Sequence, residues 1–131
     1  MLFKKRKKAP SITREQALGC RPVKNSQVRE NRNESGEVLL FYPLPNSPLV
    51  TGLVRKFGVP EGKPLSKKLQ LDILGTAVWD LMDGNRSVAK IIKKFAGQYQ
   101  LQHKEAEVSV TQFIRELGKR GLIALRRDGD L

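Results

Sequence analysis

Residues 71–95 read LDILGTAVWDLMDGNRSVAKIIKKF, and this stretch predicts two consecutive amphipathic helices. Asp72 offers a carboxylate as the N-cap of the first helix, and Asp83-Gly84 stops it because glycine readily adopts the left-handed conformation. Ser87 caps the second helix in the same way. The apolar residues of the second helix recur with helical periodicity and form a single stripe: Val88, Ile91, Ile92, Phe95 and Tyr99.

The sequence that follows predicts a third helix, from about Lys104 to Arg120. Its apolar residues repeat the spacing of the second helix: Ala106, Val110, Phe113, Ile114 and Leu117. Gly121 ends this helix. The short apolar run Leu122–Leu125 is then expected to pack back against the helices.

The residues before these helices predict strands. Lys68–Leu71 alternates polar and apolar side chains, as a half-buried strand does. Two earlier runs, Val23–Arg29 and Glu37–Tyr42, flank the turn-rich sequence ENRNESG and predict a β-hairpin. Because strands and helices are segregated along the chain, we predict an α+β fold. It would have a small three-stranded antiparallel sheet followed by a three-helix bundle, an arrangement compatible with a winged helix-turn-helix.

Charge and composition suggest how the chain is organised. The 131 residues carry a formal net charge of +12, and a chain of this length fits one domain. Residues 1–14 contain six basic residues and no acidic one, which predicts a flexible basic arm. Residues 15–127 are expected to form a single domain. Within it, residues 43–65 hold five of the seven prolines and predict a Pro/Gly-rich insertion.

The sequence favours a cytoplasmic protein. No stretch approaches the roughly 20 apolar residues of a membrane-spanning helix, and no apolar segment follows the basic start. The single cysteine, Cys20, excludes an internal disulfide and a cysteine-based zinc cluster. We therefore expect no membrane association, no metal site and no cofactor.

Catalytic constellations are not supported by the spacing of the reactive residues. His103 lies in a polar stretch without a Ser or Cys partner that spacing would single out. Capping and surface placement explain the carboxylates Asp72, Asp80 and Asp83, and Cys20 has no base paired with it in the sequence. The sequence predicts a protein that is not an enzyme.

Two kinds of binding remain open from the residues alone. A winged-helix protein could bind nucleic acid, but residues 104–120 carry a net charge of only +1. Lys90, Lys93 and Lys94 lie opposite an apolar stripe, where lysines usually form a solvated face. Alternatively, the open edge of a three-stranded sheet can accept an extended peptide through main-chain hydrogen bonds.

Residues 71–84 resemble the central signature of the PqqD family. The family pattern continues as G-x-R-[ST]-V-x-x-I, which residues 84–91 match, and then has a tyrosine, matched by Tyr99. It ends in F-[IL]-x-x-L-x-x-[RK]-G-L-I, which residues 113–123 match. The resemblance extends over roughly residues 66–125, in order and in spacing.

The resemblance implies a small, non-catalytic peptide chaperone with three strands followed by three helices. Family members bind the leader of a ribosomally made precursor peptide by strand addition and present it to a modifying enzyme. In pyrroloquinoline quinone biosynthesis the peptide is PqqA and the enzyme is the radical S-adenosylmethionine protein PqqE. Monomer and dimer both remain open. Carried onto this chain, the resemblance places the augmented edge at Lys68, Leu69, Gln70 and Leu71.

The helical wheel supplies candidates on the third helix. Ile114 points inward, and one flank of the apolar stripe carries Glu107, Thr111 and Arg115, whereas the other carries Ser109, Glu116 and Arg120. We predict that the first flank, together with Ile114, lines the peptide groove. Gly75, Trp79 and Gly84 are interpreted as packing and capping residues. An acidic leader would suit the basic chain, and the alternative function is that of a winged-helix nucleic-acid-binding protein.

Overall fold

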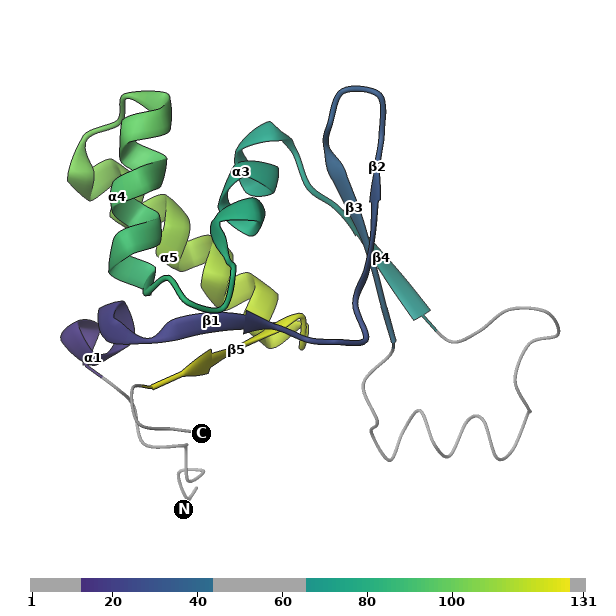
Figure 1. Cartoon of the computed structure of the whole chain (residues 1–131), viewed down its shortest axis with the longest axis horizontal. Helices are drawn as coiled ribbons and strands as arrows, with labels where there is room; N and C mark the ends of the chain where they lie inside the picture. The colour runs from purple at the N-terminus through teal and green to yellow at the C-terminus, as the bar shows by residue number, and fades with distance from the viewer. Residues whose placement is uncertain (1–12, 44–65, 128–131) are drawn as a thin grey trace, which may run out of the picture.

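The computed structural model describes residues 13–43 and 66–127, drawn in colour in Figure 1. The chain begins with helix α1 (Arg14–Gly19) and strands β1 (Arg21–Lys24), β2 (Arg29–Arg32), β3 (Val38–Pro43) and β4 (Ser66–Gln70). Helices α3 (Ile73–Leu81), α4 (Val88–Tyr99) and α5 (His103–Lys119) follow, and strand β5 (Ile123–Arg126) comes last. The predicted α+β class and the order of sheet and helices are confirmed.

The three-stranded sheet is antiparallel, in the order β2-β3-β4. Strand β3 lies at its centre, with Leu40 opposite Leu69 of β4. Val38, Leu40 and Tyr42 alternate with less buried neighbours and belong to the hydrophobic core. This alternation turns one face of the sheet toward the helices, as Figure 1 shows.

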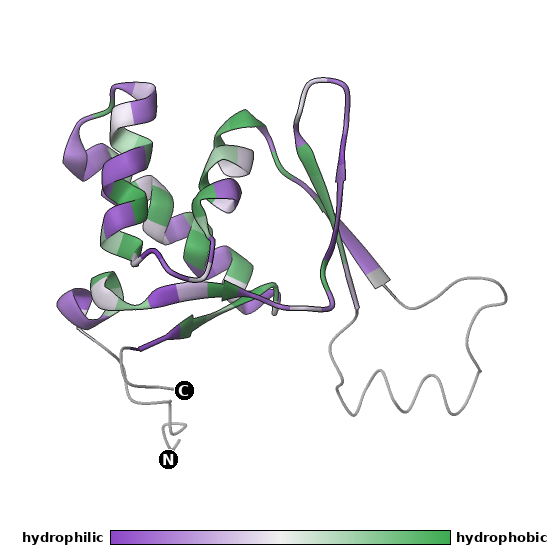
Figure 2. Ribbon diagram, in the orientation of Figure 1, coloured by the Kyte–Doolittle hydropathy of each residue, from purple (hydrophilic) through white to green (hydrophobic). Residues whose placement is uncertain are grey.

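The three predicted helices are confirmed, together with their caps. The Asp72 carboxylate accepts a hydrogen bond from the Gly75 amide at 2.7 Å, and the Ser87 hydroxyl accepts one from the Lys90 amide at 3.2 Å. Gly84 has a φ of +85°, which explains why glycine stands at this stop. Figure 2 shows the apolar faces of the helices turned toward one another and the polar faces turned outward. The sheet and helices share one core built on Trp79, Phe95 and Leu40.

The predicted first hairpin is wrong in its boundaries. The segment Val23–Arg29 contains the end of β1, a turn and the start of β2. Strand β2 instead occupies part of the sequence predicted as a turn, and all four of its residues are exposed. Arg32 of β2 forms an ion pair with Asp80 of α3 at 2.6 Å. Strand β2 is held by its pairing with β3 and by this ion pair. Because its side chains are polar, hydrophobic periodicity in the sequence could not identify it as a strand.

Strands β1 and β5 form a separate antiparallel ribbon, in which Val23 lies opposite Ala124. Figure 1 shows this ribbon below the helices, away from the three-stranded sheet. The apolar run Leu122–Leu125 was expected to pack on the helices, and Leu122 and Ile123 are indeed buried. Its pairing with β1 was not predicted.

The predicted arm and insertion extend beyond the described residues. Residues 1–12 and 44–65 lie outside them. Of the predicted arm 1–14, Thr13 is the N-cap of α1 and Arg14 is its first residue. None of the helices in the described ranges is long and apolar enough to cross a membrane.

Thr76 connects α3 to the sheet, and we expect its hydroxyl to be required for stability. This side chain is 7% exposed, and its hydroxyl accepts a hydrogen bond from the Val38 amide at 3.0 Å. Thr76→Val leaves that buried amide without an acceptor, which should lower the free energy of unfolding by about 1–3 kcal/mol in urea titrations. Thr76→Ser keeps the hydroxyl and is the control. A Val variant as stable as the Ser variant would contradict this account.

Candidate functional site: an open strand edge beside an apolar cavity

Strand β4 forms one outer edge of the three-stranded sheet, and among the described residues no strand pairs with its far side. The Leu71 amide donates to the Val38 carbonyl at 2.9 Å. Hydrogen-bonded pairs alternate along an antiparallel ladder, so Leu69 also bonds toward β3 through its opposite residue Leu40. The backbone groups of Lys68 and Gln70 therefore point away from β3. The edge presents two N–H and two C=O groups to an added strand.

A cavity of about 610 Å³ lies beside this edge. One wall comes from the end of β4 and the residues after it, and the others come from α3, the end of α4 and α5. The lining residues are Leu69, Gln70, Leu71, Asp72, Leu74, Gly75, Val78, Phe95, Leu101, Glu105, Ser109, Phe113, Glu116 and Leu117. An extended chain added to β4 could place alternate side chains in this mostly apolar space. We call this space the β4 groove.

Gly75 lies in the groove where α3 meets the Phe113 side chain of α5. A Cβ atom at this position would lie 3.4 Å from Phe113 Cε1 and 3.2 Å from the capping Asp72 Oδ1. The Phe113 ring, half-buried and packed against the core, therefore lies directly on α3. The motif suggests a packing role for Gly75, and the structure adds that this residue lines the groove.

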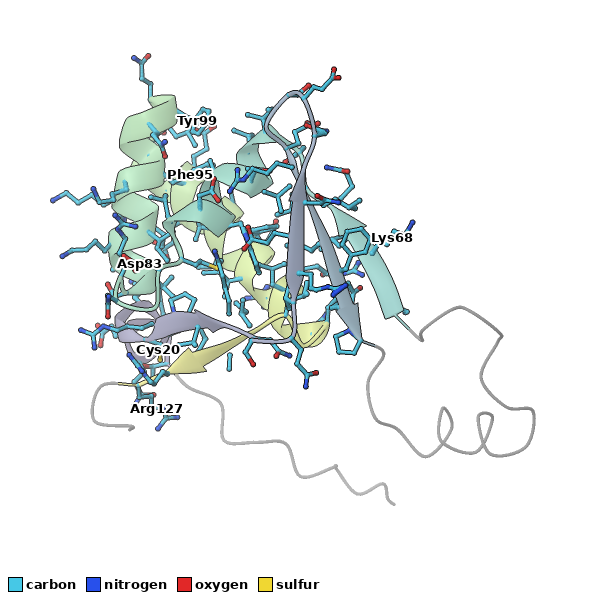
Figure 3. The ribbon with its side chains drawn as sticks, turned by 45° about the vertical axis from the view of Figure 1, so that its right-hand side comes forward. Cys20, Lys68, Asp83, Phe95, Tyr99 and Arg127 are labelled. Carbon is cyan, nitrogen blue, oxygen red and sulfur yellow. The ribbon has the colours of Figure 1, made fainter. Side chains whose placement is uncertain are left out.

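The predicted edge residues only partly line the groove. Leu69, Gln70 and Leu71 line it, with Leu71 buried. The Lys68 ammonium instead lies 5.9 Å from the centre of the Phe41 ring, and Figure 3 shows Lys68 on the outer side of the sheet. Only the backbone of Lys68 is positioned to meet an added strand.

The structure does not bring the predicted residues of α5 to this groove. Glu107, Thr111, Ile114 and Arg115 line a second cavity of about 520 Å³, formed with α1 and β5. The prediction that this flank faces the third strand of the sheet is therefore wrong. The residues of α5 that line the β4 groove are Glu105, Ser109, Phe113, Glu116 and Leu117. Ser109 and Glu116 belong to the opposite flank of the apolar stripe.

Helix α1 is the physical reason for this error. Arg14 donates two hydrogen bonds to the Glu107 carboxylate, at 2.6 and 2.7 Å. The Glu107 flank is therefore occupied by α1, a six-residue helix without buried residues. A helical wheel shows the two flanks of α5 but does not show which one another element covers.

The Arg14–Glu107 pair predicts an acid-sensitive attachment of α1. The hydrogen bond from Arg14, and then the attraction between the charges, hold the pKa of Glu107 below its usual range. A carboxylate with a lowered pKa stabilises the folded state when the pH is above the ordinary glutamate pKa. This stabilisation is lost as the pH falls through the lowered pKa. We expect hydrogen exchange of the α1 amides to accelerate in that acidic window. Glu107→Gln should remove this pH dependence, whereas Glu15→Gln, on the exposed side of α1, should keep it. An unchanged acid transition in Glu107→Gln would contradict the assignment.

Comparisons with known proteins agree with the resemblance seen in the sequence. Residues 60–123 match the family described as "Coenzyme PQQ synthesis protein D (PqqD)". No curated protein matches the chain. A solved structure described as "TbiB1 in Complex with the TbiA(beta) Leader Peptide" has a similar fold, with a TM-score of 0.54 and 19% sequence identity. That similarity covers 76% of this chain and 92% of the other. The match to the PqqD family therefore spans residues 60–123, which contain β4 and the three helices.

Proposed function

We propose that this protein binds the leader of a ribosomally made precursor peptide as an added strand on β4. The observation that carries the proposal is the open edge of β4 beside a largely apolar cavity. An added strand satisfies the outward backbone groups of Lys68 and Gln70, while its alternate side chains enter the β4 groove. The match of residues 60–123 to the PqqD family supports this function, and the similar TbiB1 structure is itself a complex with a leader peptide.

The proposal assigns the protein a chaperone role without catalysis. In the described part of the chain, His103 is exposed and lies 3.9 Å from Glu107, and Cys20 is buried with its thiol directed to the Gln16 carbonyl. Neither residue lines the β4 groove. We infer that the bound leader is presented, in the cytoplasm, to a separate modifying enzyme. A radical S-adenosylmethionine enzyme of the PqqE kind is the partner that the family suggests.

Nucleic-acid binding is the competing function. In a winged-helix protein the reading helix would correspond to α5, whose exposed cations are interspersed with Glu105 and Glu116. Charge on this helix therefore does not favour phosphate binding. The exposed lysines of α4, Lys90, Lys93 and Lys94, would be the surface to examine instead.

A titration of the isotopically labelled full chain, followed through its amide NMR signals, separates the two functions. The ligands are synthetic peptides that correspond to short open reading frames beside this protein's gene, tested as candidate leaders, and duplex DNA is added to a second sample. We expect the leader to shift signals from β4 and from the Ser109–Glu116 side of α5. Shifts of the α4 lysines with DNA, together with no response to the leader, would refute the proposal.

A further inference from the structure

The β4 groove has an acidic rim although the chain as a whole is basic. Three carboxylates line it, those of Asp72, Glu105 and Glu116. No lysine or arginine is among the described residues that line the same space. The excess positive charge lies elsewhere, for example on the exposed lysines of α4. The net charge of +12 is therefore a poor guide to the electrostatics of the groove.

Local hydrogen bonds hold Asp72 and Glu105 in position, and an ion pair holds Glu116; each carboxylate can still accept more hydrogen bonds. Asp72 caps α3 through one oxygen, as described above. Glu105 Oε1 accepts a hydrogen bond from the Gln102 amide at 3.3 Å, and Glu116 Oε2 lies 3.7 Å from an Arg120 nitrogen. An ionised carboxylate has about four lone-pair sites, so these contacts leave capacity for a ligand.

Apolar side chains line the same space as the carboxylates. Leu74 of α3 is 47% exposed although it lines the groove, and the half-buried Phe113 ring of α5 also lines it. A lysine or arginine side chain matches this arrangement, because its methylene groups cover apolar surface while its charged end stays in polar surroundings. A charge-assisted hydrogen bond to a carboxylate would then fix the charged end.

We propose that the β4 groove selects a leader that carries a lysine or arginine side chain directed at one of the two carboxylates that α5 contributes to the rim, Glu105 or Glu116. These residues lie about 16 Å apart along the helix axis, so one side chain meets one of them. This inference rests on the proposed function and names the recognition chemistry of the same site. The net charge of the chain suggests an acidic leader. The carboxylates of the groove instead predict a positively charged side chain on the leader at this position.

The test is a charge scan of the same leader, with affinity measured by fluorescence anisotropy on the full chain. Each leader position is replaced in turn by Lys and by Glu. We expect at least one position where the Lys version binds about fivefold tighter than the Glu version, the size of a partly exposed ion pair. The chain carrying both Glu105→Gln and Glu116→Gln should reduce that ratio to about twofold or less. Gln at residue 105 keeps the capping box, which limits structural side effects.

The control is Glu34→Gln, which removes a carboxylate from the exposed hairpin turn between β2 and β3. This variant should keep the Lys preference of the unaltered chain. A leader that binds without a Lys-favoured position, or with a preference that survives in the double variant, overturns the inference and leaves the proposed function standing. A leader that does not bind at all refutes the proposed function, and this inference fails with it.

Discussion

Lys68→Pro is expected to weaken leader binding at least about tenfold, the equivalent of one or two lost hydrogen bonds. Proline removes the Lys68 amide, which points away from β3 and is free of the ladder that holds the sheet together. Proline is tolerated on edge strands where the missing N–H faces outward, and it keeps the preceding residue extended. The variant therefore tests the edge without removing a bond between β3 and β4. Isothermal titration calorimetry with the leader gives the affinity.

Lys68→Ala is the matched control, because it removes the same side chain and keeps the amide. The Lys68 side chain lies over Phe41 on the outer side of the sheet, so its loss should change the affinity by about twofold or less. Equal affinities for the Pro and Ala variants would show that the leader does not pair with the β4 backbone. Far-UV circular dichroism on both variants confirms that the fold is retained.

Trp79→Ala is expected to cause the largest loss of stability, about 3–5 kcal/mol in the free energy of unfolding. The Trp79 side chain is fully buried in the core, and the Lys24 ammonium lies 4.4 Å from the centre of its ring. Truncation to alanine leaves a cavity at the junction of sheet and helices. Urea titrations followed by circular dichroism measure the change.

Two further variants keep this prediction testable even if Trp79→Ala fails to fold. Trp79→Phe keeps an aromatic ring in the core and should lose less stability than the alanine variant. Ile73→Ala truncates a side chain of the same helix that is 48% exposed, and it should change stability by about 0.5 kcal/mol or less. A Trp79→Phe loss no larger than that of Ile73→Ala would contradict the core position of Trp79.

The helices and β4 could be predicted from the sequence because their signals are local. Asp72 and Ser87 cap the helices they were expected to cap, and the stripe from Val88 to Phe95 is buried. Trp79 and Gly84 serve packing and chain reversal, as their places in the motif suggested. In each case a few neighbouring residues determine the backbone, so one sequence is sufficient.

The errors concern contacts between distant segments. Strand β2 is polar and gains its place by pairing with β3 and through Arg32, which no local pattern encodes. The choice between the two flanks of α5 depends on α1, which is attached through a pair separated by 93 residues. The sign of the charge in the β4 groove depends on which carboxylates line it. The net charge of the whole chain does not show that local arrangement.

Hydrogen exchange along β4 tests the central claim most directly, because the strand has two kinds of amide. Leu69 and Leu71 bond toward β3 and should be protected with or without ligand. Lys68 and Gln70 point outward, and their amides should exchange rapidly in the free protein and slowly when the leader is saturating. Slow exchange appearing at Lys68 and Gln70 only with the leader is the result that strand addition predicts. Exchange at these two amides that remains unchanged under saturating leader would contradict it.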